Sequence, residues 1–236
     1  MKVSKRWLRI SLSGYPIVAI LNGRKTQMRA AIVKPEGGLV LADVLGRIGC
    51  NVDGPDGAYL WDFATYQVGE RVHVVEPWRT PLRPTEPWRT PLRPTIQYQA
   101  DEWVRTPDPW PSGSTNARWS SPRHMPRWAS RLTLEILEVR LQRLHDITEA
   151  DATAEGMIFT DYGRTVYGTP QPGWSEAPSS RSDQCHGSAR AAFGDAFNRR
   201  HAGVDWNLRN GPSPWDRNPY VWAYTFKAHT GSTHGA

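Results

Sequence analysis

The chain has 236 residues, with 29 Lys and Arg against 23 Asp and Glu, so its formal net charge is +6. An apolar fraction of 39% is enough for the core of one domain, while 20 Gly and 20 Pro indicate many loops. The positive excess is compatible with a polyanionic partner but does not by itself define one.

The reactive and apolar residues exclude several classes of protein. Two cysteines, Cys50 and Cys185, cannot form a disulfide framework, and the 7 scattered His lack the spacing of a metal site. The chain has no glycine-rich phosphate loop and no nucleophile elbow. No apolar run approaches the length of a membrane span. We therefore expect no metal, no cofactor, no membrane partner and a cytoplasmic location.

The first predicted elements are a short helix and a strand. Residues 15–22 are an apolar run that stops at Gly23, which is typical of a helix with a glycine stop. The basic residues after it indicate a cationic helix end. A polar, glycine-rich stretch covers residues 36–57, and residues 71–76 have the character of a strand.

A perfect repeat follows that strand. Residues 76–85, with the sequence EPWRTPLRPT, recur unchanged as residues 86–95. Two identical copies indicate a recent duplication tolerated in an exposed loop, since functional arrays normally have three or more units. The alternative is an extended arm in which residues such as Trp78 and Arg79 grip phosphates or a partner.

The longest predicted strand comes after a second loop. Residues 104–126 are rich in Pro, Ser and Trp, which is typical of a loop. Leu132, Leu134 and Ile136 then alternate with polar residues, and the apolar set continues as far as Leu144 with a change of phase that indicates a β-bulge.

Two helices are predicted in the second half of the chain. Thr148 and Asp151 match a capping box, which predicts the start of a short helix, and Gly156 is a suitable stop for it. Residues 160–187 are predicted to be an irregular loop. Residues 188–200 are predicted to be a helix with its apolar side chains on one face.

The chain closes with an aromatic strand over residues 220–226. Its alternating Trp222, Tyr224 and Phe226 are expected in the core rather than in a stacking platform. A polar tail is predicted over residues 229–236. Several strands, few helices and long loops favour a mainly β protein of the α+β class, arranged as a small β-barrel with insertions.

Five segments in this order resemble the ASCH domain, a family of PUA-like β-barrels, and more specifically its uncharacterised phage and prophage branch. The resemblance implies a single domain over residues 1–228, with the repeat and the two loops as insertions and the tail outside it. It also implies a phage or prophage origin and thus the host cytoplasm. The segments are residues 23–29, 69–79, 123–131, 146–156 and 215–222.

The signature of the family is only half present. It has Gly, then Lys, then Glu or Thr three residues after the Lys, and Arg two residues further on. Gly23 and Lys25 match this pattern, whereas Met28 and Ala30 stand at the other two positions.

The resemblance also implies a catalytic set. Bacterial relatives include an amidohydrolase that removes the acetyl group of N4-acetylcytidine with a Lys, a Thr and a Glu. The Lys corresponds to Lys25 and the Glu to Glu155, while the Thr falls on Met28, which cannot act as a nucleophile. Thr26 replaces it only if this segment is not helical, and a water activated by Glu155 is a further route. The alternative without catalysis is a solvated cationic helix end with Glu155 on the surface.

A second group of residues indicates nucleic-acid binding. Three Arg, one His and one Trp fall within residues 123–131, which suits phosphate contact and base stacking. The alternative is that Trp128 closes the end of the barrel and the Arg side chains pair with carboxylates. The residues expected at a nucleic-acid site are Arg24, Arg29, Trp78, Arg79, Arg123, His124, Arg127, Trp128 and Arg131.

Three functions remain open from the sequence. The first is binding of RNA, single-stranded DNA or a modified nucleoside through a basic surface. The second is amide hydrolysis on an N4-acylated cytidine, with Lys25, Thr26 and Glu155 as candidate catalytic residues. The third is interaction of a phage protein with a host protein through the Trp- and Pro-rich loops.

Overall fold

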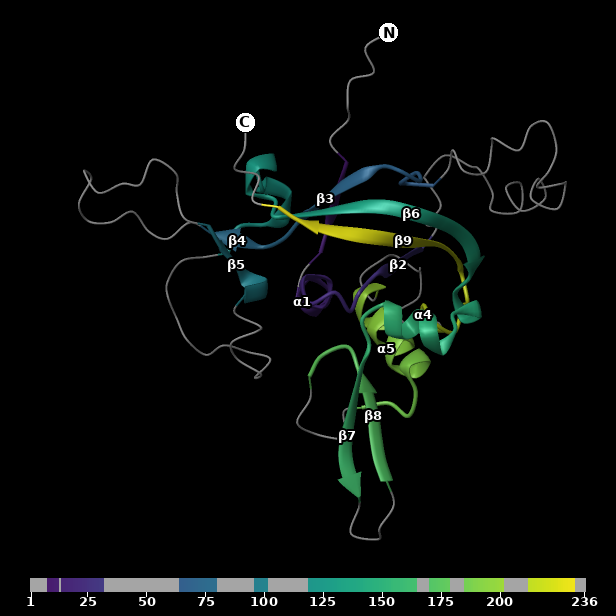
Figure 1. Cartoon of the computed structure of the whole chain (residues 1–236). Helices are drawn as coiled ribbons and strands as arrows, with labels where there is room; N and C mark the ends of the chain where they lie inside the picture. Colours follow the sequence, from purple (N-terminus) through teal and green to yellow (C-terminus); the bar gives the residue numbers. More distant parts are fainter. Residues whose placement is uncertain are drawn as a thin grey trace, which may run out of the picture.

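The computed structural model describes residues 8–12, 14–31, 64–79, 96–101, 119–164, 170–178, 185–201 and 212–231. Its centre is a five-stranded sheet with the order β1-β3-β6-β9-β2 (Figure 1). The strands are β1 (Arg9–Ser11), β2 (Gln27–Ala31), β3 (Arg71–Val75), β6 (Leu132–Arg143) and β9 (Tyr220–Thr230). The stretch 36–57, residues 80–95 of the repeat and most of the loop 104–126 lie outside the described residues.

The two longest strands, β6 and β9, form the antiparallel backbone of this sheet and curve together (Figure 1). The predicted bulge is confirmed, since the register between them shifts between Ile136 and Glu138. A bulge increases the local twist and bends the strand, which fits the curvature of the pair. β3 and β2 extend the sheet with antiparallel pairing, and β1 joins β3 in parallel.

One face of the sheet carries the larger apolar core. Strand residues alternate between faces, so every second side chain of β6 and β9 points into this core. The helix α1 (Tyr15–Leu21) packs on it with Ile17, Val18 and Ile20. The aromatic side chains of β9 are buried there, which confirms that they are core residues. They are Trp222, Tyr224 and Phe226.

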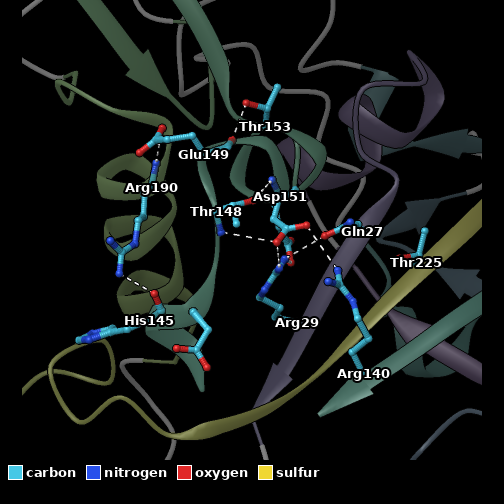
Figure 2. A network of polar contacts seen from close by, with 12 residues as sticks. Gln27, Arg29, Arg140, His145, Thr148, Glu149, Asp151, Thr153, Arg190 and Thr225 are labelled. Atoms are coloured by element: carbon cyan, nitrogen blue, oxygen red, sulfur yellow. Dashed lines mark hydrogen bonds and ion pairs between the residues drawn. The ribbon is translucent and has the colours of Figure 1, made fainter. Parts of the chain in front are cut away.

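The opposite face is covered at one end by two helices, α4 (Glu149–Ala154) and α5 (Ala189–His201). Phe193 and Phe197 of α5 are buried with Val221 of β9 in a second core. Burying such a side chain contributes about 1.5–3 kcal/mol. Both predicted helices are confirmed, and Glu149 joins them because its Oε2 accepts hydrogen bonds from the first backbone N–H groups of α5 (Figure 2).

A third apolar cluster lies under the start of β6. Val75, Met125 and Ala129 form it, and the short pair β4 (Trp78–Arg79) and β5 (Gln97–Tyr98) packs against it. Two 3-10 helices, η3 (Pro122–His124) and η4 (Arg127–Ala129), lead into β6. This cluster therefore fixes η3 and η4 relative to the sheet.

The prediction of an irregular loop over residues 160–187 is wrong in part. The strands β7 (Ile158–Arg164) and β8 (Pro170–Ser175) pair as a hairpin that projects from the rest of the molecule (Figure 1). Its proline and glycine residues, which are rare within strands, concealed it. The predicted tail also begins too early, since β9 runs to Thr230.

The protein is of the mixed class with more strand than helix, as expected, but the predicted closed barrel is wrong for the residues described. β1 pairs only with β3 and β2 only with β9, so the five-stranded sheet has two edges. Closure would require these edge strands to pair, and a local sequence pattern carries no information on which strands do so.

Candidate functional site

Lys25 lies in a short connection between α1 and β2 rather than on a helix end. Gly23 has φ +70°, which ends α1, and β2 starts at Gln27. The connection is held from both sides, since Thr26 N–H donates to Ala154 O (2.8 Å) and Thr26 O accepts from Phe226 N–H (2.9 Å). The expected cationic helix end is therefore replaced by an anchored extended segment.

Glu155 is presented at the end of α4, directly opposite. Thr148 and Asp151 form the predicted capping box of this helix, and Gly156 follows with φ +101°. A Cβ atom at Gly156 would lie 3.3 Å from Cβ of Lys25, so glycine permits this close approach. Arg24 donates to Gly156 O at 3.2 Å. The two candidate catalytic residues are thus brought together.

The pair is buried and has a third member. Lys25 Nζ lies 2.5 Å from Glu155 Oε2 and donates to Glu155 O at 2.9 Å. Arg29 Nη1 donates to the other carboxylate oxygen at 3.0 Å. The exposed fractions of Lys25, Arg29 and Glu155 are 3%, 8% and 2%, so the alternative of solvated surface residues is wrong for all three.

Asp151 is a second carboxylate of this buried cluster. Arg29 Nη2 lies 3.3 Å and Arg140 Nη2 3.4 Å from its two oxygens, and Gln27 contacts it too (Figure 2). Burial alone would raise the pKa of Asp151, but the hydrogen bond from Gln27, the charge of Arg29 and the bonds from Thr148 lower it on balance. Asp151 therefore remains a carboxylate that stabilises the guanidinium groups.

Three cations and three carboxylates meet in and beside this cluster. Lys25 and Arg29 face Glu155 and Asp151, and Arg140 lies between Asp151 and Glu138. Nε of Arg29 has no hydrogen-bond partner among the described residues. Burial lowers the pKa of Lys25, and Glu155 only partly opposes this. An amine with a lowered pKa beside a carboxylate is suited to proton transfer, which is the chemistry expected of the pair.

Met28 and Ala30, which stand at the other two positions of the ASCH signature, do not face Lys25 and Glu155. Met28 is 7% exposed and contributes to the larger core, as does Ala30, because both lie on the opposite face of β2 from Arg29. The segment is not helical, which is the condition set for Thr26 to replace the missing Thr. The side chain of Thr26, however, is exposed, whereas Lys25 and Glu155 are buried.

Gln27 and Arg140 also belong to the buried cluster, although neither was predicted as a site residue. The strand pairing reveals them, since Lys25, Gln27 and Arg29 alternate and so share one side of the chain. Arg140 is placed by its pairing with Ala223, which also pairs with Arg29. The alternation of residues 25, 27 and 29 was the one available signal in the sequence.

The expected nucleic-acid residues fall into three groups. The first belongs to the buried cluster, since Arg29 is buried against Glu155 and Arg24 donates to Gly156 O beside it. Arg123, His124, Arg127 and Trp128 are exposed on η3 and η4, and 46% of the Trp128 surface is accessible. Neither Arg123 nor Arg127 forms an ion pair with any carboxylate of the described residues. These four side chains are defined here as the basic loop.

The third group lies beside the third apolar cluster. Arg131 binds Glu76 through Nε (2.8 Å) and Nη2 (3.0 Å), binds Asp101 at 2.6 Å and lies over the ring of Tyr98. Its charge is therefore neutralised by two carboxylates. Glu76, the first residue of the repeat, is one of these two carboxylates and is only 1% exposed.

The first copy of the repeat also supplies Trp78 and Arg79. Trp78 is half-buried against the third cluster, and Arg79 donates to Gln97 at 2.8 Å and lies over the ring of Trp119. These contacts give both residues a structural role. Among the expected nucleic-acid residues that the structure describes, those of the basic loop are therefore the most exposed.

The described residues contain no group of three or more His, Cys, Asp or Glu side chains arranged to hold a metal ion. None of the helices in the same residues is long and apolar enough to cross a membrane. Comparisons with family models, curated proteins and solved structures gave no match to this chain.

Proposed function

We propose that this protein is an ASCH-type, PUA-like domain that binds RNA, single-stranded DNA or a modified nucleoside through the basic loop. The observation that supports this is an exposed Trp128 beside Arg123, His124 and Arg127, with no carboxylate of the described residues paired to either Arg. Exposed cations attract phosphates, and an accessible indole ring stacks on unpaired bases.

A fluorescence anisotropy titration with labelled single-stranded RNA and DNA oligomers tests this proposal. The double variant Arg123→Gln/Arg127→Gln should bind more weakly and with a smaller salt dependence, the slope falling by about 0.7 for each phosphate that the variant no longer binds. Trp128→Ala should cost about 1–3 kcal/mol of binding free energy. Equal affinity of the parent and these variants would contradict the proposal.

The matched control is Arg190→Gln/Arg199→Gln. Both residues are exposed on α5, and Arg199 is already paired with Asp195 and Glu176. This control removes the same net charge from the protein without touching the basic loop. Its binding curve should coincide with that of the parent, which separates a local contact from a general effect of charge.

A second candidate function is amide hydrolysis on an N4-acylated cytidine. It is favoured by the 2.5 Å contact of Lys25 with Glu155 and by the lowered pKa of the buried amine. Incubation of the parent and of a Glu155→Gln variant with N4-acetylcytidine tests it. Turnover by the parent that Glu155→Gln abolishes would support the activity, and no turnover by the parent would remove the candidate.

A further inference from the structure

We propose that the polar face of the central sheet, next to the basic loop, forms a second half of the binding surface and takes single-stranded nucleic acid. This inference rests on the proposed function and extends it to an occupant several nucleotides long. The surface, called the sheet face below, consists of two rows of side chains across the strands. They are Arg9, Arg71, His73, Thr133, Glu135, Lys227 and His229.

The first row crosses four strands in register. Arg9 pairs with His73, His73 with Thr133 and Thr133 with His229, so their side chains point to one side of the sheet. His73 Nδ1 and Thr133 Oγ1 lie 3.2 Å apart, which agrees with this orientation. Neighbouring strands are about 4.8 Å apart, so the row is on the order of 14 Å long.

The second row lies two residues away and is richer in charge. Arg71 pairs with Glu135, and Glu135 pairs with Lys227. Glu135 Oε2 lies 2.7 Å from His229 Nε2, so this carboxylate already has a partner. Arg71 and Lys227 are exposed, as is Arg9 in the first row. The sheet face therefore carries three exposed cations and one carboxylate.

The sheet face is continuous with the basic loop. Arg9 Nη1 donates to Arg123 O at 3.3 Å, which places η3 against the edge strand β1. The pKa of His73 is lowered by burial and then by the charge of Arg127, so η4 also lies near this row. A chain of phosphates that follows the basic loop would thus reach the cations of β3 and β9.

The surface ends at the β-bulge of β6. Beyond it, Arg140 lies 3.6 Å from Glu138 and 3.4 Å from Asp151, so its charge is compensated. α4 and α5 cover the rest of this face through the second core. The positive strip is therefore bounded on one side by the basic loop and on the other by paired charges.

A single strand fits this strip better than a duplex. Trp128 is accessible at one end, and an indole ring stacks on bases that are not paired. The cations follow two straight rows, which suits an extended phosphate backbone. Sequence-independent binding of this kind depends on charge and stacking rather than on base-edge hydrogen bonds.

The test compares oligomers of increasing length on the full chain. The parent should gain affinity from short to longer oligothymidylates as the second half of the surface is filled. The double variant Arg71→Gln/Lys227→Gln should bind the shortest oligomer as the parent does, lack the gain with length and reduce the salt slope by about 0.7 for each phosphate that it no longer binds. Both side chains are exposed, so circular dichroism and the melting temperature should stay close to those of the parent.

The outcomes separate this inference from the proposed function. If Arg71→Gln/Lys227→Gln binds long oligomers as tightly as the parent while the basic-loop variants do not, the sheet face is not part of the surface and the proposed function stands. If the parent binds no oligomer of any length, both are wrong. If duplex DNA of equal length binds as tightly as the single strand and Trp128→Ala has no effect, the single-stranded occupant is wrong. The Arg190→Gln/Arg199→Gln control should match the parent throughout.

Discussion

Glu155 accepts hydrogen bonds from two buried cations, Lys25 and Arg29. Substitution of any of the three should therefore lower the free energy of unfolding. Removal of one partner from a buried ion pair leaves a charge without its full compensation, which is more costly than the pair itself is favourable. The buried cluster also joins the segment after α1 to the end of α4. These contacts therefore tie together two segments that lie far apart in the sequence.

We expect Lys25→Met to lower the free energy of unfolding by about 3 kcal/mol, because Glu155 would then be buried with Arg29 alone. Urea unfolding measures this. The double variant Lys25→Met/Glu155→Gln should recover part of this stability, since it removes the uncompensated carboxylate. A single-variant effect below about 1 kcal/mol is typical of exposed pairs and would contradict the buried geometry.

His73 gives the stability a dependence on pH. Burial, and then the charge of Arg127, lower its pKa below the usual 6.5. The unfolded chain therefore takes up a proton at higher pH than the folded protein does. The free energy of unfolding should fall as the pH decreases from 6.5 through the lowered pKa.

The variant His73→Asn should have a flatter stability profile between pH 7.5 and about 5, as measured by urea unfolding at several pH values. Burial also lowers the pKa of His201, with Arg200 as the second cause, so His73→Asn/His201→Asn should be flatter still. An unchanged slope in the single variant would show that His73 takes up its proton equally in both states.

At the scale of elements, the first copy of the repeat continues directly from β3 and supplies Glu76 and Trp78 to the third cluster. Deleting residues 76–85 or residues 86–95 gives the same amino-acid sequence, because the copies are identical. In either case one copy remains to make these contacts.

We expect the shortened chain to fold and to keep its stability within about 1 kcal/mol, since the closure entropy of a loop changes slowly with its length. Thermal unfolding followed by circular dichroism measures this. Glu76→Gln in the shortened chain should be destabilising, because it weakens the pairing with Arg131. A shortened chain that fails to fold would show that the second copy makes essential contacts of its own.

The elements with a local cause could be predicted from the sequence. Each of them depends on residues that are close in the sequence. They are the Gly23 stop, the capping box of Thr148 and Asp151 and the bulge after Ile136. The segment from Lys25 to Arg29 could not, because a spacing of four residues puts two side chains on one side both in a helix and in a strand. Only its pairing with β9 decides between them.

The burial of the candidate site could not be predicted from the sequence either. Glu155 has no local signal that distinguishes a surface helix end from a buried one, and its partners come from the segment after α1 and from β2 through tertiary contacts. The open sheet could not be predicted for the same reason, since strand order is fixed by long-range pairing. In contrast, the density of Arg, His and Trp in residues 123–131 indicated a candidate surface, although it did not separate the exposed Arg123 and Arg127 from the paired Arg131.

In the molecule as a whole, the charged side chains of the described residues are distributed unevenly. Around α5 the cations are compensated, since Arg199 pairs with Asp195 and Arg200 with Glu176. Along the basic loop and the sheet face, exposed cations outnumber the carboxylates. A strip of one sign raises the local concentration of a polyanion and favours its encounter, and it does so less at high salt.

The salt dependence of binding to a single-stranded oligomer tests the role of the basic loop most directly. If the basic loop alone contacts phosphates through Arg123 and Arg127, the logarithm of the association constant should fall against the logarithm of salt concentration with a slope of about −1.4, and more steeply if the sheet face takes part. In Arg123→Gln/Arg127→Gln that share of the slope should disappear. Absence of binding even at low salt, or a slope that this variant leaves unchanged, would contradict binding of nucleic acid through the basic loop.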